Sequence, residues 1–174
     1  MKKLTVLLPL ILLITVCLFF LLFILFEKDP NNPPSALLNK DLPIFSSVSL
    51  YNDKELLISE DLKGKYTLIN FFASWCAPCK AEHNLFFEIK KEIPELYILG
   101  ISYKDDPVDS KQYLKEEGDP YSFVGIDQEG KIAFEFGVFG LPETYIVNNK
   151  GKIIFKHAGA LTKAIIDDEI TKLF

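Results

Sequence analysis

The chain has 174 residues, of which 49% are hydrophobic and 25% are charged, a composition typical of a globular protein with one domain of ordinary size. Its formal net charge is −5, every basic residue is a lysine, and no basic cluster occurs. Nucleic-acid binding is therefore disfavoured, because phosphate contacts need a positive face. The three cysteines are too few for a disulfide-stapled scaffold, so a buried core must hold the domain together.

The first element in the chain is an almost unbroken apolar run over residues 4–26. This run meets the length of roughly 20 residues that a helix needs to cross a bilayer. Lys2 and Lys3 precede it, so the positive-inside rule places the N-terminus in the cytoplasm. A cleaved signal peptide has a shorter apolar region than this run and a small-residue cleavage site. A lipoprotein signal has a small residue just before its cysteine, whereas here Val16 precedes Cys17. We expect residues 1–28 to form a cytoplasmic tip and an uncleaved transmembrane helix.

A polar, proline-rich stretch at residues 29–35 predicts a linker, and residues 36–174 then form the folded domain. Continuous apolar runs predict buried strands over residues 66–73 and 96–102. Two shorter strands are predicted over residues 44–50 and 122–126. A hairpin is predicted from residues 143–147 and 152–156. Helices are predicted from residue 80 to near Pro94, and over residues 107–117, 132–136 and 162–174, with a turn or single helical turn at 59–64. This order predicts an α/β domain with a mixed central sheet flanked by helices on both faces.

The sequence Trp75-Cys76-Ala77-Pro78-Cys79 lies between the predicted strand 66–73 and the helix that follows. Unpaired N–H groups and the helix dipole at this position stabilise a Cys76 thiolate, the species that attacks a disulfide. A disulfide between two cysteines three residues apart closes too short a loop to stabilise the fold much, which favours a redox role. In this strand-to-helix context the motif predicts a thioredoxin-like redox site.

A zinc site is the competing interpretation of these cysteines, because Cys76, Cys79, His83 and His157 are nominally a Cys2His2 set. A helical cysteine pair with its histidine one turn further is poor geometry for four tetrahedral ligands, and no second cysteine pair exists. We therefore expect no metal, and no cofactor beyond the redox-active cysteines. His83 is then expected to be a polar residue on the helix flank.

Four segments carry a resemblance to a known family: Trp75-Cys-Ala-Pro-Cys-Lys-Ala-Glu-His83, Gly100-Ile-Ser-Tyr-Lys-Asp-Asp106, Gly137-Val-Phe-Gly-Leu-Pro-Glu-Thr144 and Lys156-His-Ala-Gly-Ala-Leu161. With the apolar N-terminus, they make the chain resemble the membrane-anchored, thioredoxin-like thiol:disulfide interchange proteins of bacterial cytochrome c maturation, the DsbE/CcmG family. The resemblance covers nearly the whole chain. Leu141 and Phe139 stand where the family often has Ala and Tyr, which bears on partner preference and not on the chemistry.

The resemblance implies a thioredoxin-like fold and the reduction, outside the cytoplasm, of disulfides in apocytochrome c or in cytochrome c maturation thiol proteins. A membrane thiol reductase would supply the electrons. The chain would be a single-pass protein of the bacterial inner membrane, with its catalytic domain in the periplasm.

The resemblance also assigns roles to single residues. Cys76 would be the nucleophile and Cys79 the resolving thiol. Trp75, Leu141 and Pro142 would bind substrate, with the bond before Pro142 in the cis form and Leu141 pairing with an extended partner segment. Core packing is the alternative role for Trp75.

Glu82 and Glu143 would supply the acidic environment that is typical of the family. We expect the fold to bring both towards the thiols, where a carboxylate raises a thiol pKa and can accept the proton of the resolving cysteine. The alternative is two solvated carboxylates, the commoner fate of glutamate.

Two other functions stay open at this point. The chain can be a general extracytoplasmic thiol oxidase or isomerase, because the Ala-Pro pair between the cysteines does not set the direction of exchange. It can also be a non-catalytic module that binds apocytochrome or haem, which would tolerate serine at both Cys76 and Cys79.

Overall fold

The computed structural model describes residues 2–26 and 37–174, and within the first of these segments it describes the side chains of residues 9–23. The chain forms two compact units, residues 1–33 and residues 34–174. The linker expected at residues 29–35 lies outside the described residues.

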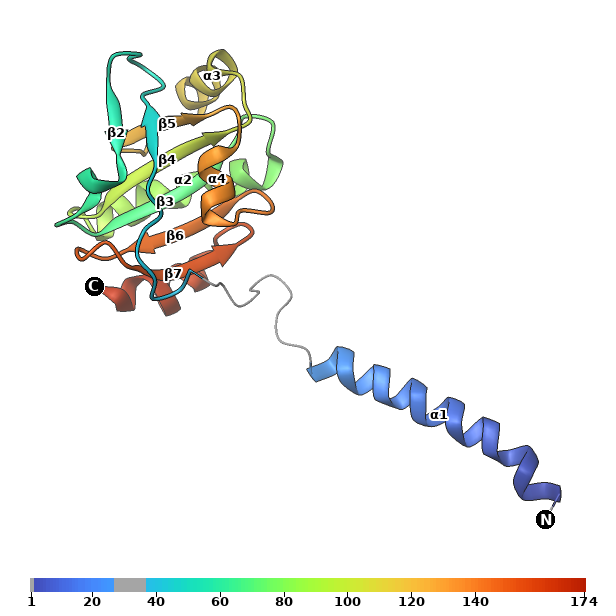
Figure 1. The fold of residues 1–174 in the computed structure, drawn as a ribbon. Coiled ribbons are helices and arrows are strands. Elements are labelled where there is room, and N and C mark those ends of the chain that lie inside the picture. The colour runs from blue at the N-terminus through green and yellow to red at the C-terminus, as the bar shows by residue number, and fades with distance from the viewer. Residues whose placement is uncertain (1, 27–36) are drawn as a thin grey trace. The chain divides into compact units, whose positions relative to one another are not determined.

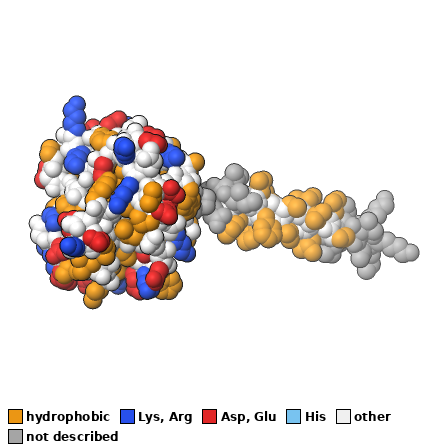
Figure 2. Space-filling view, turned by 90° about the horizontal axis from the view of Figure 1, so that it is seen from above, with side chains coloured by type: hydrophobic (Ala, Val, Ile, Leu, Met, Phe, Trp, Pro, Cys, Tyr) orange, Lys and Arg blue, Asp and Glu red, His pale blue; other side chains and the backbone are white. Residues whose placement is uncertain are grey.

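The first unit contains one helix, α1 (Lys2–Phe26), with Pro9 inside it. The helix covers the apolar run of the sequence, and its side chains drawn in Figure 2 are mainly hydrophobic. Over the part of the chain that the structure describes, no helix combines the length and the hydropathy that a membrane crossing requires. The transmembrane anchor therefore stays a prediction.

The second unit is built on a five-stranded mixed sheet with the strand order β5-β4-β3-β6-β7 (Figure 1). Strands β3, β4 and β5 are parallel, whereas β6 is antiparallel to both β3 and β7. The strands are β3 (Thr67–Phe72), β4 (Tyr97–Tyr103), β5 (Phe123–Asp127), β6 (Glu143–Val147) and β7 (Ile153–Ala158). All six residues of the central strand β3 are buried, as expected for a strand that is covered on both faces.

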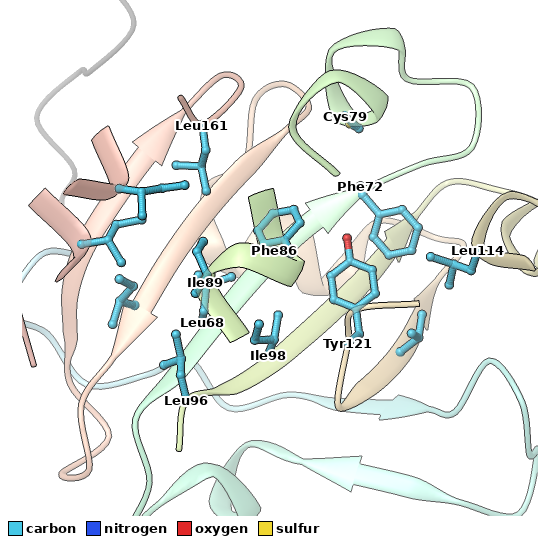
Figure 3. Packing of buried hydrophobic residues seen from close by; sticks show 14 of the residues in the cluster. Leu68, Phe72, Cys79, Phe86, Ile89, Leu96, Ile98, Leu114, Tyr121 and Leu161 are labelled. Atoms are coloured by element: carbon cyan, nitrogen blue, oxygen red, sulfur yellow. The ribbon is translucent and has the colours of Figure 1, made fainter. Parts of the chain in front are cut away.

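Helical segments cover both faces of this sheet. They are η1 (Ser59–Leu62), α2 (Ala77–Glu92), α3 (Pro107–Glu117), α4 (Lys131–Phe136), α5 (Lys163–Ile165), η2 (Ile166–Ile170) and η3 (Thr171–Leu173). Alternate residues of β3 point to opposite faces, so Leu68 and Phe72 join one core cluster and Ile69 and Phe71 the other. The first cluster, part of which Figure 3 shows, receives side chains from α2, α3 and the C-terminal segment. The second receives them from η1 and α4. The expected α/β fold with a mixed sheet is confirmed.

Local sequence signals account for the bounds of the helices next to the site. Helix α2 begins after Cys76, has Pro78 in its first turn, and ends one residue before Ile93, which Pro94 follows. Helix α3 begins after Asp106, whose Oδ1 accepts a hydrogen bond from Val108 N at 2.8 Å.

The structure differs from the predictions at two places. Strand β1 (Ser46–Val48) pairs with β2 (Leu56–Ile58) in a separate two-stranded sheet, and β2 was not predicted because three residues are too few for a periodic pattern. The C-terminal residues 163–173 are helical but pass from an α turn into a π segment and a 3-10 turn. Ile166 and Ile170 are fully buried there and join the core cluster on the α2 side of the sheet.

Candidate active site

The two cysteines lie where β3 leads into α2, and they form a disulfide with a Cα–Cα distance of 5.3 Å. Both are nearly buried, at 4% exposure for Cys76 and 3% for Cys79. Cys76 caps the helix, and its Sγ accepts a hydrogen bond from Cys79 N at 3.2 Å. When the disulfide is reduced, the same N–H and the positive end of the helix dipole stabilise a thiolate at Cys76.

Trp75 projects from the domain beside this disulfide. Its side chain is 60% exposed, and its indole Nε1 donates a hydrogen bond to Lys104 O at 3.3 Å. The core-packing role that the sequence left open for Trp75 is therefore wrong. A large, flat apolar surface held by one polar contact is suited to binding a partner.

Leu141 and Pro142 leave the sheet at the edge where β3 runs into the cysteine turn. The antiparallel register pairs Phe71 of β3 with Glu143 of β6. The Leu141–Pro142 segment that precedes β6 therefore lies beside the turn that follows β3 and leads to the cysteines. The Leu141–Pro142 peptide bond is cis, which confirms the prediction. The Pro142 carbonyl accepts a hydrogen bond from Gly159 N at 2.8 Å, and Leu141 is half-buried.

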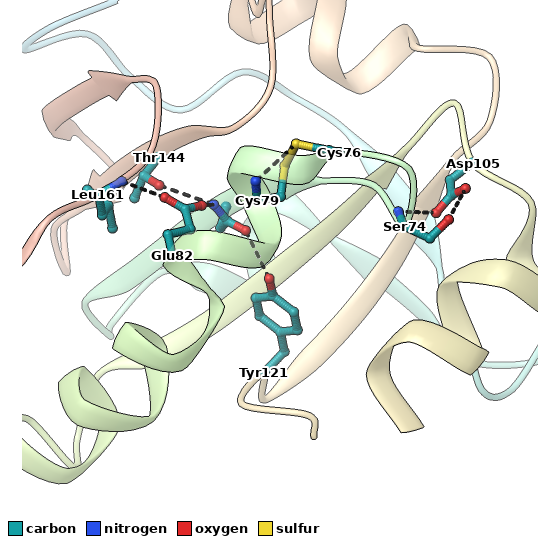
Figure 4. Close-up of a disulfide and its surroundings, with 9 residues drawn as sticks. Ser74, Cys76, Cys79, Glu82, Asp105, Tyr121, Thr144 and Leu161 are labelled. Atoms are coloured by element: carbon teal, nitrogen blue, oxygen red, sulfur yellow. Dashed lines mark hydrogen bonds between the residues drawn. A yellow bond between two sulfur atoms is a disulfide. The ribbon is translucent and has the colours of Figure 1, made fainter. Parts of the chain in front are cut away.

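Glu82 lies one turn after Cys79 on α2 and is almost fully buried, with 1% of its surface exposed. Its Oε1 accepts a hydrogen bond from Asn70 Nδ2 at 2.9 Å, and its Oε2 accepts one from Leu161 N at 2.6 Å (Figure 4). Burial raises the pKa of Glu82 to about 7, although both hydrogen bonds act in the lowering direction. A carboxyl group with such a pKa can take up and release a proton near neutral pH.

Glu143 is buried on the opposite face of the sheet from Glu82. Its Oε2 pairs with Lys156 Nζ at 3.2 Å and lies 2.7 Å from Tyr145 Oη, while its Oε1 accepts a hydrogen bond from Phe139 N at 3.1 Å. The expectation that the fold brings both glutamates towards the thiols is therefore corrected. Neighbouring residues of a strand alternate between its faces, so Thr144 faces α2 and Glu143 faces α4. The contacts of Glu143 instead tie down the loop that carries Leu141.

His83 is a buried residue of the core and not a polar residue on the helix flank. Its Nε2 lies 2.8 Å from Gly118 O, and its ring packs edge-on against Tyr113. His157 lies on β7 and stacks on Phe155. Among the described residues, no three His, Cys, Asp or Glu side chains are grouped as a metal site.

Asp105 belongs to the Gly100–Asp106 motif, and its role at the site was not predicted from the sequence. Its carboxylate accepts hydrogen bonds from Ser74 N at 2.7 Å and Ser74 Oγ at 2.8 Å, directly before the Trp-Cys pair (Figure 4). It also accepts one from Ser110 Oγ at 2.6 Å. The neighbouring Lys104 has φ of +46°, uncommon for a residue other than glycine, and its carbonyl holds Trp75. An Asp-Asp pair after a strand was the available signal, but only the fold shows which residues it contacts.

Replacing Asp105 with alanine is expected to lower the free energy of unfolding by about 2–4 kcal/mol, because it removes a buried carboxylate that accepts hydrogen bonds from Ser74 and Ser110 and leaves the partly buried Ser74 N–H without its partner. The matched control is Asp106→Ala, which removes a helix cap that does not contact Ser74 and is expected to cost about 1 kcal/mol. Chemical denaturation of the full-length protein measures both. Equal losses in the two variants would contradict the role of Asp105.

Comparison with known proteins agrees with this geometry. The Redoxin family model matches residues 38–171. The thiol:disulfide interchange protein DsbE of Escherichia coli (strain K12) is 33% identical over 178 residues, which cover 100% of this chain and 95% of that protein. The chain belongs to the DsbE/CcmG family. HelX of Rhodobacter capsulatus is 36% identical over 151 residues, covering 87% of this chain and 85% of HelX.

Another relative with the same description is the thiol:disulfide interchange protein CycY of Rhizobium leguminosarum, 40% identical over 135 residues that cover 78% of this chain and 72% of CycY. The solved structure of a DsbF homologue from Corynebacterium diphtheriae superposes with a TM-score of 0.69 at 18% identity, covering 84% of this chain and 97% of that one. That likeness shows the fold. With its disulfide at the start of α2, this DsbE/CcmG-family chain is a thiol:disulfide oxidoreductase.

Proposed function

We propose that this protein is a membrane-tethered reductase of disulfides in apocytochrome c or in the thiol proteins of cytochrome c maturation. The observation that carries the proposal is the Cys76–Cys79 disulfide at the N-terminus of α2, in a chain of the DsbE/CcmG family. The substrate class rests on the family resemblance of the sequence motifs.

The reaction starts from the reduced dithiol. The Cys76 thiolate attacks one sulfur of the substrate disulfide, forming a mixed disulfide and releasing the other substrate sulfur as a thiolate that takes up a proton. Cys79 then gives its proton to the Glu82 carboxylate and attacks Cys76 Sγ, which expels the second substrate sulfur as a thiolate that takes up a proton and leaves the enzyme disulfide. Two electrons pass from the enzyme to the substrate, and a membrane thiol reductase returns them.

The partner would bind across Trp75 and the Leu141–Pro142 segment. An extended peptide can pair with the Leu141 backbone next to the disulfide, since Pro142 has no N–H to continue a strand. Glu143 supports this surface through its bonds to Lys156 and to Phe139 N, and so acts as a positioning residue.

The reducing direction is supported by the buried acid close to the thiols, because a carboxylate disfavours a thiolate at Cys76 and so destabilises the reduced form. We expect a reduction potential below roughly −180 mV, measured by equilibration with a reference dithiol. A potential near about −120 mV, that of a strong oxidant, would contradict a reductase and favour the oxidase.

The pre-reduced full-length protein is also expected to reduce an intramolecular disulfide of apocytochrome c. The control is the double variant Cys76→Ser, Cys79→Ser, which keeps the surface but has no dithiol. If this variant supported cytochrome c maturation as well as the parent protein, the chain would be a binding module and not a reductase.

The tether is supported by the apolar sequence of α1 and the lysines that precede it. We place the catalytic domain in the periplasm and α1 in the bacterial inner membrane. Membranes washed with alkaline carbonate are expected to retain the full-length protein. Its appearance in the wash would contradict the anchor.

A further inference from the structure

Asn70 is a fully buried polar residue in the middle of β3, among apolar neighbours that form the core. A buried amide is costly unless its polar atoms are hydrogen-bonded. Both ends of the Asn70 amide are bonded: Nδ2 donates to Glu82 Oε1 at 2.9 Å and to Thr144 Oγ1 at 3.2 Å, and Oδ1 accepts from Tyr121 Oη at 2.9 Å. The side chain therefore joins the helix that carries the cysteines to the sheet.

The partners of Asn70 fix which way its amide points. When Glu82 is ionised its carboxylate can only accept hydrogen bonds, so in that state the NH2 group faces Glu82 and the oxygen faces Tyr121. The Tyr121 hydroxyl then acts as the donor. Burial raises the pKa of this hydroxyl well above its usual value, so it keeps its proton.

The sheet is built to admit this arrangement. Asn70 lies between Thr144 and Gly100 in the register of the three central strands. A Cβ atom on Gly100 would lie 2.9 Å from Tyr121 Cγ and 3.0 Å from Phe72 Cε1, so the absence of a side chain there gives the tyrosine ring its place. Figure 3 shows the rings of Tyr121 and Phe72 next to each other in the core. Tyr121 stacks on Phe72 with the ring centroids 5.1 Å apart. Its hydroxyl is thus held at Asn70 by the packing of a rigid ring.

We propose that Asn70, held in place by Tyr121, is a positioning residue that orients Glu82 and sets its proton affinity for the step in which Cys79 releases the partner. The inference rests on the proposed function of Glu82. Donors to the carboxylate stabilise its charged form against burial, so the Leu161 N–H and the Asn70 amide together keep Glu82 able to accept a proton near neutral pH.

The other groups around Glu82 do not replace this donor. Tyr113 of α3 and Tyr121 interact with its charge from outside the helix, and burial raises the pKa of both hydroxyls, so both are neutral. On α2 itself, Cys79 lies one turn before Glu82, and the adjacent His83 is engaged by Gly118 O. Leu161 N holds the second carboxylate oxygen, and Thr144 contacts Asn70 from β6.

The test compares Asn70→Leu and Tyr121→Phe with the parent protein in carboxyl-carbon NMR titrations of Glu82. We expect the pKa of Glu82 to rise by about one unit in Asn70→Leu, since the carboxylate loses a donor, and to rise by less in Tyr121→Phe. The midpoint of the pH–rate profile for release of a mixed disulfide should move to higher pH together with the pKa of Glu82. The control is Tyr113→Phe, which removes from the same core a buried hydroxyl that has no hydrogen-bond partner among the described residues; it should change neither the pKa of Glu82 nor the pH–rate midpoint.

An unchanged pKa of Glu82 in Tyr121→Phe and Asn70→Leu would overturn the inference. If Asn70→Leu does not fold, the pKa of Glu82 in Tyr121→Phe tests the inference. The parent protein provides a second test, because its Asn70 amide resonances should shift with pH at the Glu82 midpoint. Failure of the proposed function gives a different result: Glu82→Gln would then release the mixed disulfide at the parent rate, even if the Asn70 variant changes the pKa of Glu82.

Discussion

Replacing Cys79 with serine is expected to stop the enzyme at a covalent complex with its partner. The Cys76 thiolate still attacks the substrate disulfide, but a serine hydroxyl cannot expel the substrate thiol from the mixed disulfide. Turnover should fall to the rate seen without enzyme. Non-reducing electrophoresis of full-length protein purified from its cells should show an adduct that dissociates with reductant, and mass spectrometry identifies the partner.

Two controls separate this result from incidental thiol chemistry. Cys17 is a free, exposed cysteine of α1, so every variant carries Cys17→Ala. The reciprocal variant Cys76→Ser should be equally inactive but form no adduct, because the helix N–H that stabilises a thiolate is directed at the sulfur of Cys76, and Cys79 is expected only to resolve. Equal trapping by both single variants would contradict the division of roles between Cys76 and Cys79.

Replacing Glu82 with glutamine is expected to slow release of the mixed disulfide by about 100-fold or more, the usual contribution of a positioned proton acceptor. In the parent protein the release rate should rise with pH through about 7, where Glu82 ionises. The variant should lose this dependence. Stopped-flow measurement with a preformed mixed disulfide separates the release step from the first attack.

The same substitution should change how stability depends on pH. The pKa of Glu82 is about 7 in the folded protein, against 4.5 for the free group, so between these values the folded state holds a proton that the unfolded state has lost. The protonated Glu82 therefore contributes its full stabilisation of the folded state below pH 4.5, and this contribution is lost as the pH rises through 7. Relative to Glu82→Gln, the parent protein should lose on the order of 3 kcal/mol of unfolding free energy across this window.

Denaturation at several pH values measures this difference. The control is Glu88→Gln, an exposed glutamate on the same helix, which should follow the parent protein within about 0.5 kcal/mol at every pH. Parallel pH curves for the parent and Glu82→Gln would show that Glu82 ionises normally and would contradict the raised pKa that suits it to proton transfer near pH 7.

The sequence by itself determined the fold class and the position of the redox pair. The β3 strand was predicted from its continuous apolar run, and the α2 helix from apolar residues at helical spacing with Pro94 marking its end. A Cys-x-x-Cys at such a junction acquires its chemistry from local backbone geometry, since the N–H groups that stabilise the thiolate belong to the same helix turn. Predicting the fold class and the position of the redox pair therefore required no knowledge of contacts between distant residues.

Only the tertiary structure decided which polar side chains surround that pair. Glu143 and Thr144 are adjacent in sequence, yet the alternation of the strand sends them to opposite faces, so Glu143 supports a loop while Thr144 joins Asn70 and Glu82. The donor from Leu161 and the hydroxyl of Tyr121 come from segments 79 and 51 residues away from their partners. The register of the sheet and the packing of buried rings set such contacts, and neither is encoded in local spacing.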